Sequence, residues 1–288
     1  MGKRKEVEEI VPAKYSHMSF SWFFVSILSI ISLQNRPLSL PKKNHHFVVI
    51  AHRGDHVSAP ENTVKAYENA IQHGADYIEI DLRTSKDSAL VIMHDATVNR
   101  MTDHKGKVSE FLLDSLRKMK VYNKEHPEFG SYHIPDFAEV LRLAKNKIHI
   151  YLDFKDASVK QAYQAIRNAG MEKQVIVYIN SMQQLYDWRK IAPHMPLMIS
   201  LPGNIKHGQD LKNLLLKYSF DLLDGSYTDY NTELLTAASQ KNIPVWPDIQ
   251  SADENPAIWH IPVSMGIRGL QTDHPEELIR YLTQLGLR

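Results

Sequence analysis

Short apolar runs alternate with longer amphipathic stretches over most of this chain. Each run is bounded by polar or turn-forming residues, which is typical of buried parallel strands. We expect strands at residues 47–51, 77–82, 90–93, 148–154, 175–179, 197–201, 222–225, 244–246 and 267–270. Helical periodicity predicts helices at residues 63–73, 109–118, 135–144, 158–169, 182–191, 211–217, 232–240 and 276–285.

This alternation predicts an α/β fold with a parallel sheet covered by helices. If residues 90–93 extend the second strand, the pattern holds eight strand–helix units. Eight units in about 250 residues match the size of a TIM (β/α)₈ barrel. A doubly wound open sheet is the alternative, but no G-x-G-x-x-G motif follows the first strand.

The N-terminal segment differs from the rest of the chain. Residues 20–33 form an uncharged apolar run behind the basic residues 3–5. A helix of that length spans about 21 Å, short of the ~30 Å hydrocarbon core of a bilayer. We therefore interpret residues 1–34 as a signal peptide, with an uncleaved membrane anchor as the alternative. Acidic residues in the leader and the lack of an Ala-x-Ala site leave a third interpretation, in which the segment is neither.

The domain organisation and location follow from this interpretation. Residues 35–45, which contain Pro37 and Pro41, predict an extended linker, and residues 46–288 form the barrel domain. An exported protein, periplasmic or extracellular, is expected to keep no stable membrane span after cleavage. An anchored protein would face outward.

Composition narrows the classes of function. Lys and Arg total 34 and Asp and Glu total 33, so the net charge of +1 argues against a protein that coats nucleic acid. The absence of cysteine excludes disulfides, thiol nucleophiles, zinc–cysteine sites and iron–sulfur clusters. Any metal must therefore be held by carboxylates, imidazoles, carbonyls or water.

Three carboxylates fall on predicted strands. Glu79 and Asp81 are separated by one residue, so both side chains point to the same face of their strand. Inside a barrel they would repel each other and lose hydration, which a hard divalent cation such as Ca²⁺ or Mg²⁺ relieves. Asp153, at the end of the next strand, is a suitable third ligand. The alternative is a set of surface carboxylates on an edge strand.

Four basic residues also lie at strand ends. His52 and His94 each follow an apolar run, and two imidazoles beside a metal-bound phosphate can divide general base and general acid work. Arg53 and Lys155 are predicted to contact phosphate oxygens. A structural ion pair is the alternative for Arg53, and a solvated strand end is the alternative for Lys155.

Other residues have two interpretations. Glu61 either reaches into the site or stays outside it, and Trp246 is either a core aromatic or a wall for the alcohol part of the substrate. Asn62 or Thr63 is expected to cap the helix that follows. Asp273 is interpreted as the cap of the last helix.

Several motifs occur together in a fixed order. They are His52-Arg53-Gly54, Pro60-Glu61-Asn62-Thr63, residues 74–81 around Glu79 and Asp81, His94-Asp95 with Arg100 and Thr102, Ile134-Pro135, Asp153-Phe154-Lys155, Val245-Trp246 and Thr272-Asp273. In order and spacing, over about residues 47–285, these resemble the glycerophosphodiester phosphodiesterase family. The resemblance implies a TIM barrel with a small insertion after the second strand. It also implies cation-dependent hydrolysis of glycerophosphodiesters to sn-glycerol 3-phosphate and an alcohol.

The resemblance assigns roles to single positions. His52 and His94 match the family's acid–base pair, Arg53 and Lys155 its phosphate contacts, and Glu79 and Asp81 two metal ligands. Asp153 stands where the family usually has Glu. The shorter side chain is expected to draw the metal deeper, admit a water or change the metal preference. Pro247-Asp248 also departs from the usual Thr or Val followed by Asn, which affects the alcohol pocket more than the chemistry.

Other functions remain open at this stage. A lysophospholipase D-like or sphingomyelinase D-like activity on the same barrel is the nearest alternative, and an apolar patch at the barrel mouth would favour it. A non-catalytic protein that captures phosphorylated polyols is a second, and a purely structural barrel is a third. The expected partner is a small glycerophosphodiester, and the sequence does not indicate an oligomeric state.

Overall fold

The computed structural model describes residues 40–42, 44–251 and 253–288. The predictions for residues 1–34 lie outside the described residues. Within the described part, none of the helices combines the length and the apolar character that a membrane crossing requires. The described end of the predicted linker contacts the barrel, because the carbonyl of Lys42 lies 3.0 Å from His149 Nε2 and His45 Nδ1 lies 2.7 Å from Asp76 Oδ1.

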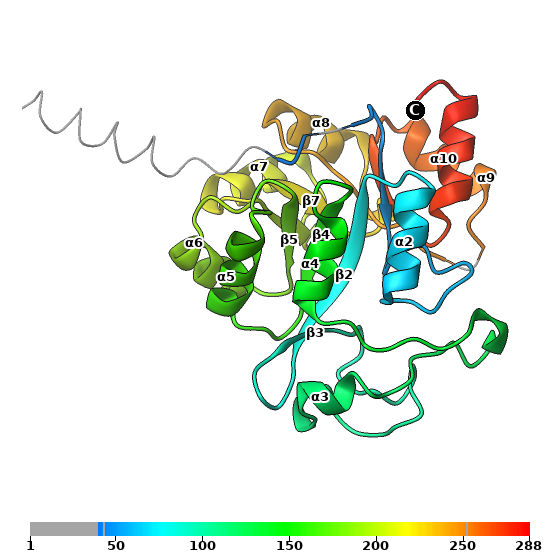
Figure 1. Cartoon of the computed structure of the whole chain (residues 1–288). Helices are drawn as coiled ribbons and strands as arrows, with labels where there is room; N and C mark the ends of the chain where they lie inside the picture. Colours follow the sequence, from blue (N-terminus) through cyan, green and yellow to red (C-terminus); the bar gives the residue numbers. More distant parts are fainter. Residues whose placement is uncertain (1–39, 43, 252) are drawn as a thin grey trace, which may run out of the picture. The chain divides into compact units, whose positions relative to one another are not determined.

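The centre of the molecule is a curled parallel sheet (Figure 1). The strands are β1 (Val48–Ala51), β2 (Tyr77–Thr84), β3 (Leu90–Ile92), β4 (His149–Phe154), β5 (Val175–Ile179), β6 (Leu197–Ser200), β7 (Leu222–Asp224) and β8 (Gly269–Thr272). Apart from β3, they pair in parallel in the order β7-β6-β5-β4-β2-β1-β8.

Residues 244–249 close the sheet between β7 and β8. The Trp246 N–H donates to the carbonyl of Leu223 on one side, and the Gln271 N–H donates to the carbonyl of Pro247 on the other. Short parallel bridges extend these contacts along the segment. The eight-unit α/β barrel that the sequence predicts is confirmed.

Helices connect the strands and cover the outside of the sheet (Figure 1). They are α2 (Val64–Gln72), α3 (Leu113–Leu116), α4 (Phe137–Ala144), α5 (Val159–Ala169), α6 (Met182–Ile191), α7 (Gly208–Lys217), α8 (Thr232–Gln240), α9 (Pro256–Ser264) and α10 (Pro275–Gln284). Helix α9 was not predicted from the sequence, because Pro262 and an apolar sequence hide its period. Its start is well specified, since Asn255 accepts hydrogen bonds from two backbone N–H groups and Pro256 occupies the first turn.

The insertion after β2 differs in detail from the expectation. Residues 90–93 do not extend the second strand, because β3 turns back antiparallel to β2 with Leu82 opposite Ile92. The helix expected at 109–118 is reduced to a 3-10 turn (Val108–Glu110) and α3. The insertion keeps a small core of its own beyond the carboxyl end of β2, in the lower part of Figure 1.

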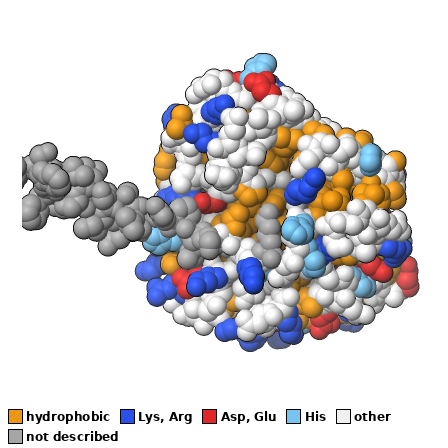
Figure 2. All heavy atoms as spheres, turned by 90° about the horizontal axis from the view of Figure 1, so that it is seen from above, with side chains coloured by type: hydrophobic (Ala, Val, Ile, Leu, Met, Phe, Trp, Pro, Cys, Tyr) orange, Lys and Arg blue, Asp and Glu red, His pale blue; other side chains and the backbone are white. Residues whose placement is uncertain are grey.

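The barrel interior changes character along its axis. Near the amino ends of the strands it holds an apolar layer, formed by Val48, Ile50, Tyr77, Tyr151, Ile176, Met198, Leu222 and Trp246. Because alternate residues of a strand share a face, the positions two residues further along also point inward. Those positions are polar, which places the chemistry at the carboxyl ends. Figure 2 views the opposite end, where hydrophobic side chains lie between Lys and Arg side chains.

Candidate active site

The polar layer forms a pocket of about 240 Å³ at the carboxyl ends of the strands. Its lining brings together seven of the nine residues that the sequence predicts for the site, among them His94 from the loop after β3. These seven are His52, Arg53, Glu79, Asp81, His94, Asp153 and Lys155. The other two predicted residues, Glu61 and Trp246, are not among the residues that line it.

Glu79, Asp81 and Asp153 form a carboxylate triad. One oxygen of each lies within 4.8 Å of the others, and the register of β2 and β4 places Asp81 directly beside Asp153. Glu79 and Asp81 are only 2% and 1% exposed. Burial, followed by the charges of Asp81 and Asp153, raises the pKa of Glu79 well above its ordinary value. Such a concentration of buried acceptor oxygens fits a hard divalent cation.

The backbone at Arg53 turns toward this triad. Its N–H donates to Glu79 Oε2 at 2.8 Å, in a left-handed conformation with φ of 52°. Gly54 follows with φ of 82°, and a Cβ there would meet the carbonyl carbon of Ala66 at 2.8 Å. The glycine of this motif is therefore needed for the close approach of β1 to α2.

Asn62 has a role that the sequence analysis missed. The expected cap is Thr63, whose hydroxyl accepts from the Ala66 N–H, and that prediction is confirmed for Thr63. Asn62 instead adopts a positive φ of 55° and donates from Nδ2 to Asp81 Oδ2 at 2.7 Å. The Tyr67 hydroxyl donates to Asn62 Oδ1 at 2.8 Å, which fixes the amide orientation. Asn62 thus holds one carboxylate of the triad.

Lys155 lies against the other side of the triad. Its Nζ is 3.0 Å from Asp81 Oδ1 and also donates to Asp153. Burial lowers the pKa of Lys155, but the charges of Asp81 and Asp153 outweigh this effect and raise it above the ordinary value. Asn180 donates to Asp153 Oδ1 at 2.7 Å. Lys155 is therefore a fixed cation at the edge of the triad.

Both histidines are oriented by a carboxylate. His52 Nδ1 lies 2.7 Å from Asp273 Oδ1, and His94 Nδ1 lies 2.7 Å from Asp95 Oδ1. A carboxylate at Nδ1 places a proton on that nitrogen and leaves Nε2 free to exchange one. Burial lowers the pKa of His52, although the hydrogen bond to Asp273 opposes this shift.

The interpretation of Asp273 as a helix cap is wrong. The residue that precedes α10 is His274, and the Asp273 side chain turns to His52 instead. The Asp273 N–H donates to Glu254 Oε1 at 2.8 Å, which holds the loop after β8 in place. His56 Nε2 also lies 3.5 Å from Asp273 Oδ1. Asp273 follows Gln271 by two residues, and this spacing was the sequence signal that its side chain points into the barrel.

Glu61 connects two arginines. It accepts from Arg53 Nη1 at 3.0 Å and from both terminal nitrogens of Arg100. Burial raises the pKa of Glu61, but the hydrogen bonds from Arg100 and the charge of Arg53 lower it to about 2. Asp95 also binds Arg100, at 2.9 Å from Nε. Glu61 therefore fixes the orientation of the Arg53 guanidinium. Through Arg100 and Asp95 it also links Arg53 to His94.

Trp246 lies in the apolar layer, which agrees with the core interpretation and not with a wall for the alcohol. It is 1% exposed, and its ring centroid is 5.4 Å from that of Tyr77. Gly269 leaves the space for the indole, which a Cβ at that position would enter.

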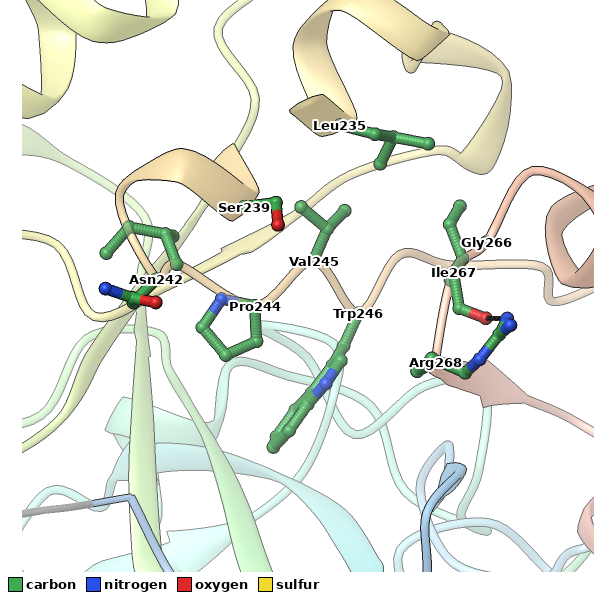
Figure 3. Close-up of a pocket in the computed structure, with 10 residues that line it drawn as sticks. Leu235, Ser239, Asn242, Pro244, Val245, Trp246, Gly266, Ile267 and Arg268 are labelled. Atoms are coloured by element: carbon green, nitrogen blue, oxygen red, sulfur yellow. Dashed lines mark hydrogen bonds between the residues drawn. The ribbon is translucent and has the colours of Figure 1, made fainter. Parts of the chain in front are cut away.

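A second hollow, of about 360 Å³, lies near the amino ends of the strands beside Trp246 (Figure 3). Its lining mixes apolar side chains with Ser239 and Asn242, and its one charged group is Arg268, which donates to the carbonyl of Ile267 at 2.8 Å. It contains no carboxylate or imidazole among its lining residues. This hollow therefore lacks the groups that phosphodiester chemistry requires.

Further polar residues line the active pocket, and of these only Asp248 was singled out from the sequence. They are Tyr151, Tyr178, Asn180, Asp224, Asp248, Gln250 and Gln271. Tyr178, Asp224 and Asp248 follow an apolar interior residue by two positions, so extending the period of each strand by one step would have pointed to them. The shortness of β7 and of the 244–249 segment concealed that period.

Sequence comparison matches most of the chain to a known family. A profile described as "Glycerophosphoryl diester phosphodiesterase family" matches residues 52–277. A "Glycerophosphodiester phosphodiesterase" of Caldanaerobacter subterraneus subsp. tengcongensis is 29% identical over 246 residues, which cover 83% of this chain and 99% of that protein.

Structural comparison gives the same barrel. A glycerophosphodiester phosphodiesterase from Agrobacterium tumefaciens str. C58 matches with a TM-score of 0.73 at 21% identity, covering 81% of this chain and 99% of the other. An Oleispira antarctica phosphodiesterase, in complex with the product sn-glycerol-3-phosphate, matches with a TM-score of 0.71 at 18% identity, covering 82% and 96%.

Proposed function

Since this chain belongs to the glycerophosphodiester phosphodiesterase family, we propose that it hydrolyses glycerophosphodiesters to sn-glycerol 3-phosphate and an alcohol with a divalent cation. The observation that carries this proposal is the position of two aspartate-oriented histidines, His52 and His94, in the pocket that contains the carboxylate triad. A site that only bound a phosphorylated polyol would not require two imidazoles held for proton transfer.

Glu79, Asp81 and Asp153 would hold the cation, and the all-oxygen set favours Ca²⁺ or Mg²⁺. When bound, such a cation neutralises charge on the phosphate and lowers the pKa of an oxygen nucleophile. Asn62 and Asn180 hold Asp81 and Asp153 in place for it. Supporting groups of this kind fix ligand orientation before the ion arrives.

Arg53 and Lys155 stabilise the negative charge of the reacting phosphoryl group. Both lie beside the triad, and both are already positioned by carboxylates, Arg53 by Glu61 and Lys155 by Asp153. A preoriented cation needs little reorganisation as charge develops in the transition state, which makes its stabilising effect larger.

His52 and His94 divide the proton transfers. One imidazole in its neutral form accepts a proton at Nε2 from the attacking hydroxyl or water. The other imidazole donates a proton to the leaving alkoxide oxygen. Asp273 and Asp95 stabilise the imidazolium form of each ring in turn.

The lining of the pocket favours a short polar alcohol over a lysolipid. A lysolipid site is expected to present an apolar wall near the phosphate. The residues that line this pocket have carboxylate, cationic, imidazole, amide or tyrosine side chains, with no aliphatic side chain among them.

The direct test is release of sn-glycerol 3-phosphate from glycerophosphocholine, glycerophosphoethanolamine and glycerophosphoinositol with Ca²⁺, Mg²⁺ or EDTA. The proposal expects metal-dependent release from at least one of them. Folded protein that releases none with either metal, but cleaves lysolipids, would overturn it in favour of a lysolipid phosphodiesterase.

A further inference from the structure

We propose that Asp224, Asp248 and Gln271 form a subsite for a primary ammonium group on the alcohol half of the substrate. The inference rests on the proposed function and deepens it, because it names the head-group class that the pocket selects. The subsite belongs to the polar layer and takes no part in the proton transfers described above.

Two of these residues, Asp224 and Asp248, lie across the pocket from the triad, and Gln271 on β8 lies beside Asp248. Around the barrel wall the strands follow in the order β1, β2, β4, β5, β6 and β7, then the 244–249 segment in place of a strand, and then β8. Asp224 on β7 is therefore four positions around the barrel from β2. Asp248 on the 244–249 segment is likewise four positions from β4. A substrate whose phosphate sits at the triad directs one of its ester arms toward them.

The subsite has acceptor atoms without donors. Gln271 is 4% exposed and donates from Nε2 to Asp248, while its Oε1 has no hydrogen-bond partner among the described residues. Asp224 is 2% exposed and accepts from the Tyr151 hydroxyl through Oδ2, while its Oδ1 likewise has no such partner. Buried acceptors left unpaired are costly, so a ligand that brings donors is favoured.

The subsite also has negative charge without a cation. Lys155 and Arg53, the lysine and arginine that line the pocket, make their ion pairs with Asp81, Asp153 and Glu61. Neither Asp224 nor Asp248 has an ion-pair partner among the described residues. Burial is the largest cause that raises the pKa of Asp248 to about 6, although hydrogen bonds with Gln271 and Asp224 oppose this shift. Burial, followed by the charge of Asp248, raises the pKa of Asp224 well above its ordinary value.

A primary ammonium meets both requirements. It carries three N–H donors and one positive charge on a single atom, so it can donate to Gln271 Oε1 and to the carboxyl pair at once. A neutral polyol brings donors without charge. A quaternary ammonium brings charge without any N–H donor and leaves Gln271 Oε1 unpaired.

The test compares three substrates at neutral pH in the presence of the activating metal. They are glycerophosphoethanolamine, glycerophosphocholine and glycerophosphoglycerol, assayed with the wild type, Asp248→Asn, Gln271→Leu and the exposed control Asp229→Asn. The readout is the ratio of kcat/KM values between substrates on one preparation, which does not depend on the fraction of folded enzyme. Cation stoichiometry is measured by calorimetry on the same proteins.

The proposal expects wild type and Asp229→Asn to prefer the ethanolamine substrate by at least about tenfold over the other two, since the buried acceptors discriminate against ligands that leave them unpaired. The preference falls to about twofold or less in Asp248→Asn and Gln271→Leu, while one cation still binds. Equal losses on all three substrates, or no wild-type preference, would overturn the subsite. A second cation that disappears in Asp248→Asn would also overturn it, in favour of a metal site. Failure of the wild type on every substrate would instead overturn the proposed function.

Discussion

Asp273 accepts a hydrogen bond from His52 Nδ1 at 2.7 Å, although the two residues are 221 positions apart in the sequence. The parallel pairing of β1 with β8 brings them together, because each follows the end of its strand. Asp95 makes the same 2.7 Å contact with His94 from the adjacent position in the chain. The two imidazoles of the site therefore have matching supports that the chain supplies in different ways.

We predict that Asp273→Asn lowers kcat by about 10²–10⁴-fold with little change in KM, because the amide no longer fixes the tautomer or stabilises the imidazolium. The pH profile should also change, since His52 loses the interaction that raises its pKa. Steady-state kinetics across pH measures both effects. Asp229→Asn, an exposed substitution of the same kind, is the control, and an equal loss there would point to a general structural effect.

Glu79→Gln is expected to weaken metal binding and to raise the stability of the metal-free protein. Loss of a direct ligand should weaken cation affinity by more than about 100-fold. The metal-free variant should nevertheless be more stable by about 1–3 kcal/mol, because folding no longer has to bury the charge of this carboxyl beside two others or to protonate it. Calorimetric titration and chemical unfolding in EDTA measure the two quantities, with the exposed Glu68→Gln as control. A metal-free variant less stable than wild type would contradict this account of the triad.

Glu79 also affects how the stability of the metal-free protein depends on pH. The pKa of Glu79 is raised by folding, so the folded state holds its proton to higher pH than the unfolded state. The free energy of unfolding should therefore fall as the pH rises above 4.5, the ordinary value for this carboxyl. Unfolding in EDTA at a series of pH values should show this slope in the wild type and a smaller slope in Glu79→Gln.

Glu61→Gln should destabilise the protein by about 3 kcal/mol, because it leaves Arg53 and Arg100 without their shared carboxylate. The pKa of Glu61 falls from 4.5 to about 2 on folding, so its contribution is present above pH 4.5 and is lost as the pH falls toward 2. Urea unfolding over this range tests the sign. Glu276→Gln, which breaks an exposed pair with Arg280, should cost less than about 1 kcal/mol. Similar losses in both variants would rule out a special role for Glu61.

The parts of the fold that the sequence predicted are those with a strong local period. Buried strands such as β2 and β4 and capped amphipathic helices such as α5 appear near their expected positions. The β2–β3 hairpin was missed because its turn residues, 85–89, lie between two apolar runs that read equally well as one strand. Helix α9 was missed because Pro262 and its all-round apolar sequence remove the helical period.

The site residues also divide into those that a local sequence pattern indicates and those that it does not. Glu79, Asp81 and His52 could be predicted because each adjoins a buried run, so its strand fixes its direction. The partners Asn62 and Asp273 could not, because their roles depend on which strands become neighbours in the closed barrel. Both were interpreted as helix caps, the local role that their sequence context favours. Tertiary contacts decided otherwise.

In the proposed mechanism, His52 and His94 transfer the protons for hydrolysis beside a metal held by the triad. The most direct measurement is the turnover of sn-glycerol 3-phosphate release by His52→Ala and His94→Ala, with cation affinity measured on the same preparations. The account predicts that each variant loses about 10²–10⁴-fold in kcat while it binds the cation as the wild type does. Near-normal turnover in both variants would contradict it.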